Sequence, residues 1–289
     1  MARAHRHFVA GQVWHITQRC HNKDFLLRYS IDRRRWMYWL FQARRRYKLC
    51  ILNYTVTSNH VHLLVQDCGD NSIPNAIQLV ASRTAQEFNK RQGRRGAFWD
   101  DRYHATAVQS DAHLLRCMAY IDLNMVRARR VEHPIDWRES GYFETLHPKK
   151  RGGRIDPKKL CELLGFDTPA QLQLARDAWI AALLDANELQ RQAYWTESVA
   201  VGNREYAVFM KRALGSSSPG RQPRSEGDCY SLREERACYL STTTSSQSMT
   251  EISGDAADLR IPWESSKNPV PETKVSFTDF VPDNSSFEC

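Results

Sequence analysis

The stretch "SNHVHLLVQ", Ser58–Gln66, places two histidines on either side of one valine and continues as an apolar run. Successive side chains of a β-strand point to opposite faces of the sheet. His60 and His62 therefore share one face, and the apolar residues between and after them mark the other face as the core side. Two neutral imidazoles at this spacing can bind one metal ion. Structural histidine pairs are also common, so the pair alone leaves both interpretations open.

The sequence around this strand alternates between strand-like and helix-like patterns. Period-two or β-rich runs predict strands over 13–19, 49–57, 60–66 and 103–108. Apolar residues at helical spacing predict helices over 31–48, 72–91 and 111–127. The order β-α-β-β-α-β-α predicts an α+β fold, with a ferredoxin-like antiparallel sheet and helices on one face.

Composition divides the chain into three parts. Residues 1–150 hold the alternating pattern, and three helical stretches in 155–214 predict a small helical accessory domain. Those helices could form a DNA-binding helix-turn-helix or only pack against the first domain. Residues 216–289 are rich in Ser, Thr, Pro and Gly, which predicts a mostly disordered acidic tail.

The charge is unevenly distributed. The net charge is +8, but 216–289 carries −5 and 1–215 carries +13. A basic body favours a polyanionic partner, either nucleic acid or a membrane surface. No apolar run approaches the roughly 18 residues of a membrane span, and the N-terminus lacks a signal-peptide pattern. The eight cysteines form no CxxC motif, so we expect no membrane association and a cytoplasmic, reducing environment.

The helix predicted over 111–127 carries a second polar pair. Tyr120 and Asn124 are four residues apart and therefore lie on one face. That face is roughly 100° from the apolar stripe of the same helix, at about 100° per residue. An Asn carboxamide oxygen is a possible metal ligand and a Tyr hydroxyl a possible nucleophile. A half-buried tyrosine with a helix-terminal asparagine would produce the same pattern.

The two pairs together resemble a known family. "NHVHLLV", followed some sixty residues later by "YIDLNMVRA", resembles the single-tyrosine HUH transposases. Among these, the sequence is most similar to the REP-associated tyrosine transposases of the IS200-like family, over about residues 8–145. Met125 and Arg129 replace the proline and glycine that are usual in the second block, which leaves the end of that helix open.

The resemblance implies a function and a set of site residues. Tyr120 would be the nucleophile, and His60, His62 and Asn124 would bind a divalent metal ion, Mg²⁺ or Mn²⁺. The reaction would be transesterification of single-stranded or hairpin DNA through a 5′-phosphotyrosine, which stores the cut end covalently. Relatives act as monomers or as homodimers, and the sequence does not decide between them.

Arginines supply candidate DNA contacts. Two triplets, 33–35 and 44–46, lie about three turns apart in the helix predicted over 31–48 and could form a basic stripe or a solvated surface. Phe98 and Trp99 could stack on unpaired bases or belong to the core. The arginines expected to contact DNA are Arg33, Arg34, Arg44, Arg45, Arg94, Arg95, Arg102 and Arg127.

Two other functions remain open at this point. A domesticated DNA-hairpin-binding protein would keep the fold and the basic surface without cleavage. A metallohydrolase would use the histidine pair with a water nucleophile and would need a carboxylate base. The carboxylates available for that role are Asp100, Asp101 and Asp122.

Overall fold

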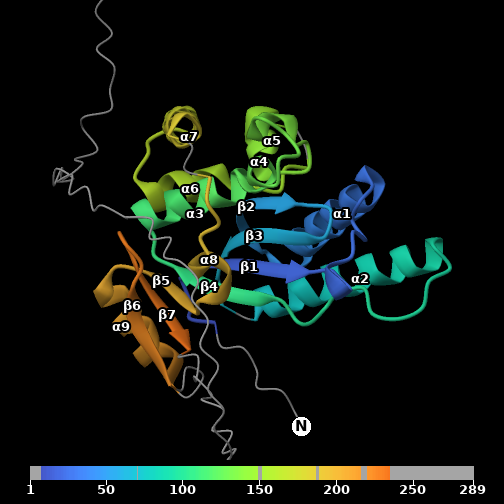
Figure 1. The fold of residues 1–289 in the computed structure, drawn as a ribbon, viewed down its shortest axis with the longest axis horizontal. Coiled ribbons are helices and arrows are strands. Elements are labelled where there is room, and N and C mark those ends of the chain that lie inside the picture. The colour runs from blue at the N-terminus through green and yellow to red at the C-terminus, as the bar shows by residue number, and fades with distance from the viewer. Residues whose placement is uncertain (1–7, 70, 149–151, 187–188, 216–219, 235–289) are drawn as a thin grey trace, which may run out of the picture. The chain divides into compact units, whose positions relative to one another are not determined.

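The computed structural model describes residues 8–69, 71–148, 152–186, 189–215 and 220–234 (Figure 1). All of these belong to one compact unit, Met1–Cys238. Its first part is a β-α-β-β-α-β unit. The elements are β1 (Val13–Arg19), α1 (Ser30–Tyr47), β2 (Cys50–Val56), β3 (His60–Gln66), α2 (Ser72–Arg91) and β4 (His104–Val108).

The first four strands are arranged in the order β2-β3-β1-β4, and every neighbouring pair is antiparallel. The two helices of this unit, α1 and α2, pack against each other. This order and these directions are those of a ferredoxin-like sheet, so the predicted α+β fold class is confirmed. The strand bounds predicted for 13–19 and 60–66 agree with β1 and β3 residue for residue.

The strand register brings polar side chains to one face. His62 of β3 lies opposite Thr17 of β1 and Thr55 of β2. The pairing of β2 with β3 shifts between Ile51 and Asn53, where β2 carries a bulge. Residues 53 and 55 therefore share a face, and that face is the one on which His62 lies.

This face is covered by α3 (Ala112–Asp122). Asn53 Nδ2 donates to Asp122 Oδ1 at 2.9 Å, and Thr55 Oγ1 donates to the Ile121 carbonyl at 3.2 Å. Asp111 caps the helix by accepting from the His113 amide, as its position predicts. The helix predicted over 111–127 is interrupted at Leu123, and α4 (Asn124–Arg127) continues it.

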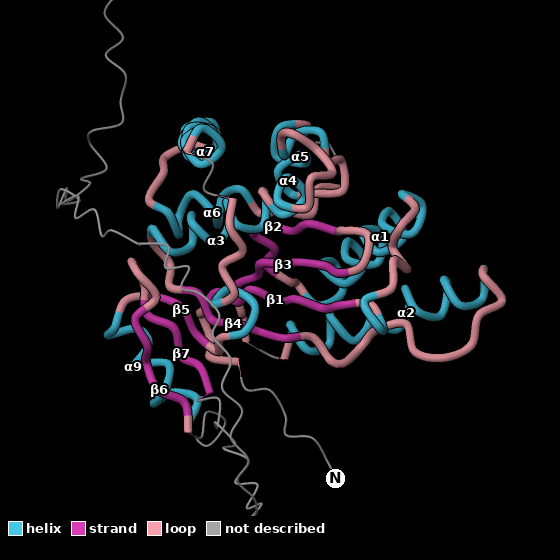
Figure 2. Tube along the Cα trace, in the orientation of Figure 1, coloured by secondary structure: helices cyan, strands magenta, loops and turns pink. Residues whose placement is uncertain are grey.

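The second part of the unit extends the same sheet. It contains α5 (Gly141–Leu146), α6 (Pro157–Leu164), α7 (Pro169–Asp185), α8 (Tyr194–Glu197), β5 (Ala200–Gly202), α9 (Arg204–Leu214), β6 (Arg221–Ser225) and β7 (Tyr230–Glu234). Short 3-10 turns occur at His21–Lys23 and Pro134–Asp136. β5 pairs in parallel with β4, and the strand order continues β4-β5-β7-β6 (Figure 2).

Residues 155–214 are largely helical, as expected, and they share the core of the first part. Leu160, Leu172, Trp195 and Met210 belong to the same buried cluster as the side chains of β1 and β3. A buried ion pair adds to this, because Arg176 of α7 binds Asp122 at the end of α3 with a shortest distance of 2.7 Å. The accessory helices are therefore packed against the helix that carries Tyr120.

The hairpin β6–β7 falls within the stretch that composition predicted to be disordered. Leu232 and Cys229 are almost fully buried, and β7 pairs with β5. Apolar burial and backbone pairing thus order 221–234 despite its polar composition. The remainder of the predicted tail, residues 235–289, lies outside the described residues. Within the described part of the chain, no helix is long and apolar enough to cross a membrane.

Candidate active site

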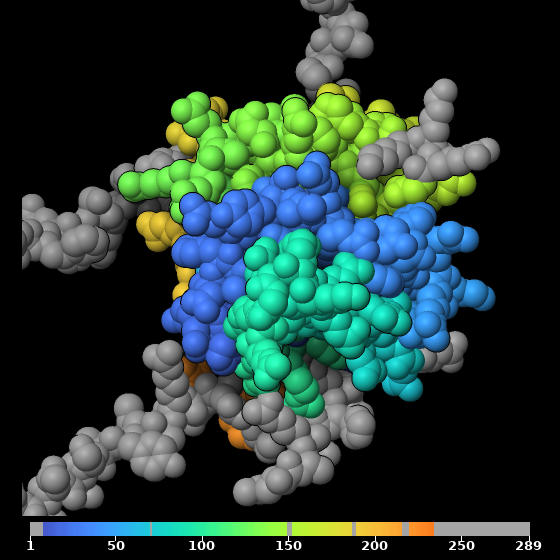
Figure 3. Space-filling view, turned by 90° about the vertical axis from the view of Figure 1, so that its right-hand side faces the viewer, coloured from blue at the N-terminus to red at the C-terminus, as the bar shows by residue number. Residues whose placement is uncertain are grey.

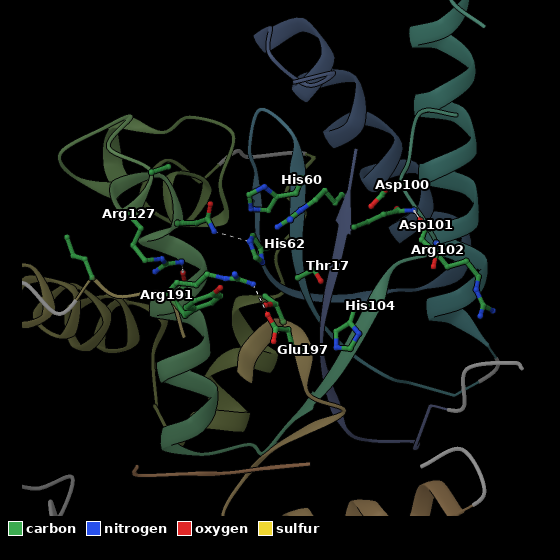
Figure 4. Close-up of a pocket in the computed structure, with 17 residues that line it drawn as sticks. Thr17, His60, His62, Asp100, Asp101, Arg102, His104, Arg127, Arg191 and Glu197 are labelled. Carbon is green, nitrogen blue, oxygen red and sulfur yellow. Dashed lines mark hydrogen bonds and ion pairs between the residues drawn. The ribbon is translucent and has the colours of Figure 1, made fainter. Parts of the chain in front are cut away.

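The residues singled out in the sequence meet in one cleft. The cleft has a volume of about 610 Å³ and is lined by His60, His62, Tyr120 and Asn124 among others. Figure 4 shows Arg127 and Arg191 on one side of His62, with Asp100, Asp101 and Arg102 on the other. The two histidines come from β3, the tyrosine from α3 and the asparagine from the first residue of α4.

His62 is held in one tautomer by a chain of hydrogen bonds. His15 Nδ1 lies 2.8 Å from the Trp195 carbonyl, which can only accept, so this nitrogen carries a proton. His15 Nε2 is then an acceptor, and it lies 2.9 Å from His62 Nδ1. His62 Nδ1 therefore donates, and its Nε2 keeps a lone pair directed toward Asn124.

Burial keeps these histidines neutral. Desolvation lowers the pKa of His62 well below 6.5, and it lowers the pKa of His60 to about 4 and that of His15 to about 3. Neighbouring positive charges, including the Arg127 guanidinium, act in the same direction. Near pH 7 the imidazole nitrogens thus have free lone pairs, as metal ligands must.

The donor set suits a divalent metal ion. His60 Nδ1 lies 2.7 Å from Asn59 Oδ1 and 2.9 Å from Thr57 Oγ1, so His60 donates to the amide oxygen and keeps an Nε2 lone pair. The ring centroids of His60 and His62 are 4.9 Å apart. Asn124 Nδ2 donates to His62 Nε2 at 2.9 Å, and a half-turn of this carboxamide would present Oδ1 instead.

The Asn124 amide oxygen is the candidate for the third donor. Across the described residues there is no group of three or more His, Cys, Asp or Glu side chains placed to hold a metal. Two imidazole nitrogens with one carboxamide oxygen carry no charge, so a bound divalent cation would keep its full charge. Imidazole and oxygen ligands together suit Mn²⁺ and admit Mg²⁺.

Tyr120 lies beside this donor set. Its ring centroid is 5.9 Å from that of His62, and only 6% of its surface is exposed. Burial raises the pKa of the Tyr120 hydroxyl above 10, while the positive charge of Arg127 counteracts this. The Arg127 guanidinium lies 4.1 Å from the ring centroid and donates to the Tyr120 carbonyl at 2.6 Å.

Several lining residues were not anticipated from the sequence. Arg191, Thr196 and Glu197, which come from the segment around α8, form one wall of the cleft. Arg191 Nη2 lies 2.9 Å from Glu197 Oε1. No motif in this segment points to the cleft. His15 lies two residues before Thr17 in β1, so it is on the same face of the sheet as the cleft residues.

Of the arginines expected to contact DNA, the structure brings Arg102 and Arg127 to the cleft. The basic stripe of α1 is not continuous. Arg33 points inward, donates to the Leu27 and Arg28 carbonyls and lies 3.3 Å from Glu139. Its charge is compensated within the protein, because loop carbonyls and a carboxylate surround it.

The remaining expected arginines lie elsewhere on the surface. Arg44 donates to the Gly153 carbonyl at 2.9 Å, and Arg94 donates to the Ala97 carbonyl at 2.9 Å. Arg34, Arg45 and Arg95 are exposed. Contact of these five residues with DNA stays a prediction. Phe98 is a core residue, 2% exposed, and does not offer a surface for base stacking.

The carboxylates are divided between cleft and core. Asp100 and Asp101 line the cleft. Asp122 does not, because Asn53 and Arg176 bind it in the core. Asp122 is therefore unsuited to serve as a general base for a bound water.

The cleft geometry agrees with the comparison with protein families. Residues 9–124 match the model described as Transposase IS200 like. The matched residues make up about two fifths of the chain, and over this part the chain is similar to IS200-like transposases. The match includes both histidines and Tyr120 and ends at Asn124, so every member of the donor set and the nucleophile candidate lie within the matched residues. The narrower assignment to the REP-associated branch stays a prediction.

Two solved structures resemble the chain at low identity. One is described as a REP-associated tyrosine transposase bound to a REP hairpin; it has 18% identity and a TM-score of 0.43, with 51% of this chain and 87% of that chain covered. The other is a Deinococcus radiodurans R1 protein described as a candidate transposase, with 15% identity, a TM-score of 0.29 and coverage of 36% and 84%. These scores are too low to transfer a function. No curated protein matches the chain.

Proposed function

We propose that this protein is an IS200-like transposase that acts as a metal-dependent endonuclease and strand transferase. It would act on single-stranded DNA at hairpin-containing repeats and form a 5′-phosphotyrosine intermediate through Tyr120. The observation that carries the proposal is the meeting of His60, His62, Asn124 and Tyr120 in one cleft. The two pairs are some sixty positions apart in the sequence, and only the fold brings them together.

The chain's own groups suit this chemistry. Tyr120 Oη forms a bond to phosphorus while the bond from phosphorus to the 3′ oxygen breaks; the phenol proton leaves Oη, and the released 3′ oxygen gains a proton. Arg127 lies against the Tyr120 ring and favours the phenolate, whose formation burial opposes. Arg102 and Arg127 also place positive charge where a phosphodiester would enter, whereas Arg191 is paired with Glu197.

A metal ion fits the same site. His60, His62 and Asn124 would hold it, and when bound it would polarise the scissile phosphate and neutralise developing negative charge. His15 and Trp195 orient His62 for this task from behind. We propose Mg²⁺ or Mn²⁺ as the cofactor, and single-stranded or hairpin DNA as the partner of a monomer or homodimer.

The direct test is covalent capture. Hairpin oligonucleotides taken from the DNA beside this gene, with single-stranded flanks and a label at either end, are incubated with the protein and Mn²⁺ or Mg²⁺. We expect a denaturing gel to show protein joined to the DNA on the 5′-phosphate side of the cut. Tyr120→Phe should abolish this band and keep DNA binding.

The other outcomes select the alternatives. Cleavage without a protein adduct, retained in Tyr120→Phe, would indicate a hydrolase with a water nucleophile and Asp100 or Asp101 as base. Tight binding of hairpin DNA without cleavage on any substrate, with and without metal, would indicate a domesticated hairpin-binding protein. No structural observation favours that last function over cleavage, since all four site residues are present.

A further inference from the structure

A second hollow is lined in part by Ser58, which lies in the turn that joins β2 to β3. It has a volume of about 520 Å³ and is lined by Phe25, Arg28, Arg33, Ser58, Arg130 and Trp137. A volume between roughly 300 and 1,000 Å³ is usual for small-ligand sites. Three arginines and two aromatic residues line it, and no carboxylate does.

Two of these arginines are free to bind an anion. Arg33 is bound by Glu139 and by loop carbonyls. Arg28 and Arg130 are exposed, and within the described part of the chain neither has a carboxylate within 4 Å. The hollow therefore offers two uncompensated positive charges, which favours a ligand with phosphate groups.

The aromatic residues add flat apolar surface. Phe25 is 59% exposed and stands in the loop between β1 and α1. Trp137 is held in place, because its Nε1 donates to the Val56 carbonyl at 2.9 Å and the Arg33 guanidinium lies 4.6 Å from its ring centroid. An exposed ring and a fixed ring that line the same hollow are suited to stacking on an unpaired nucleobase.

The second hollow and the candidate active site share their framework. Ser58 lines the hollow, and Thr57 and Asn59 on either side of it hold His60 Nδ1. Arg130 lines the hollow, and Arg127, three residues earlier, lines the cleft. In Figure 3 the blue N-terminal residues lie against the green residues that follow α3, as the lining of the hollow requires.

We propose that this hollow is a nucleotide subsite for the single strand that enters the active site. An unpaired base stacks on Phe25 and Trp137, and the adjoining phosphate binds Arg28 and Arg130. The inference rests on the proposed action on single-stranded DNA and extends it: one base, some way from the cut along the strand, contributes to binding. Duplex DNA does not present such a base.

The test measures binding without cleavage. Fluorescence anisotropy in EDTA records the affinity for a labelled 20-mer of oligodeoxythymidine, for a 20-mer of abasic units with the same phosphates, and for a 20-base-pair duplex. Phe25→Ala should weaken binding of the thymidine 20-mer about tenfold and leave binding of the abasic and duplex probes unchanged. Arg130→Gln should weaken binding of both single-stranded probes.

Matched controls separate the subsite from general effects. Phe209→Ala removes an exposed phenylalanine (47% against 59% for Phe25), and Arg212→Gln removes an exposed arginine; both lie in α9, which does not line the hollow. Neither control variant should weaken binding of the single-stranded probes in the way expected for Phe25→Ala or Arg130→Gln. Equal affinity of wild type and Phe25→Ala for the thymidine 20-mer would overturn the subsite alone. If wild type bound no single-stranded probe, nor the hairpin oligonucleotides, the proposed function would fail as well.

Discussion

His15 Nε2 lies 2.9 Å from His62 Nδ1, although the two residues come from different strands and 47 positions separate them. The Trp195 carbonyl fixes the proton on the far nitrogen of His15. This fixes the tautomer of His62 and the direction of its Nε2 lone pair. A residue that binds no substrate thus decides whether a proposed metal ligand is ready to bind.

Replacement of His15 should therefore weaken metal binding. We expect His15→Ala to lower the affinity for Mn²⁺ by about 10- to 100-fold, the usual effect of losing a group that orients a metal-binding histidine. Titration calorimetry of the DNA-free protein measures this directly. His15→Gln, which can keep both hydrogen bonds, should recover part of the affinity. Unchanged Mn²⁺ affinity in a folded His15→Ala protein would contradict this role.

Arg127 should contribute to the cleavage rate through its charge. Its guanidinium lies 4.1 Å from the Tyr120 ring centroid. Burial raises the pKa of the Tyr120 hydroxyl, and the positive charge of Arg127 acts in the opposite direction. We expect Arg127→Gln to slow adduct formation by about 100-fold, in the range for loss of one transition-state donor. Single-turnover rates measure this, and the difference in rate between wild type and Arg127→Gln should become smaller as pH rises. Arg138→Gln, which changes an exposed arginine that does not line the cleft, should react like wild type.

Local sequence patterns predicted much of this site, because its candidate ligands and nucleophile lie in two short sequence motifs. Strand alternation gave the shared face of His60 and His62, and helical spacing gave the shared face of Tyr120 and Asn124. That the two pairs meet in one cleft could be predicted only from the family resemblance. Residue spacing within one segment does not show how β3 and α3 pack against each other. The structure supplies this through the hydrogen bonds from Asn53 and Thr55 to α3.

Long-range contacts account for what the sequence did not reveal. Arg33 belongs to a triplet that reads as a basic surface, but the Leu27 carbonyl and Glu139 turn it inward. Arg191 and Glu197 reach the cleft because α7 packs against α3 and α8 packs against β1 and β4. No periodicity marks such a residue, since its position depends on partners more than a hundred residues away.

The buried histidines should make stability depend on pH. His15 and His60 have folded-state pKa values of about 3 and about 4, and that of His62 is also far below the unfolded value near 6.5. Below pH 6.5 the unfolded chain binds protons that the folded chain does not, so the free energy of unfolding falls as pH decreases. The loss is about 1.4 kcal/mol per pH unit for each histidine, between pH 6.5 and about 4.

Urea unfolding of the metal-free protein at several pH values between 7.5 and 4.5 tests this. His15→Gln should reduce the slope by about one third, because one of three such groups is lost. A free energy of unfolding that stays constant over this range would contradict the lowered pKa values of these histidines in the folded protein.

The buried pair Asp122–Arg176 should stabilise the attachment of α7 to the tyrosine helix. Both side chains are almost fully buried, and Asn53 completes their hydrogen bonding. Arg176→Met leaves a buried carboxylate without a partner and should lower the free energy of unfolding by about 3–5 kcal/mol. Adding Asp122→Asn should recover much of this lost stability, because the uncompensated charge is removed.

Arg191→Gln, which breaks an exposed pair with Glu197, should lower the free energy of unfolding by under about 1 kcal/mol in the same urea measurement. A loss in Arg176→Met no larger than that of Arg191→Gln would mean that the buried pair does not hold the two helices together.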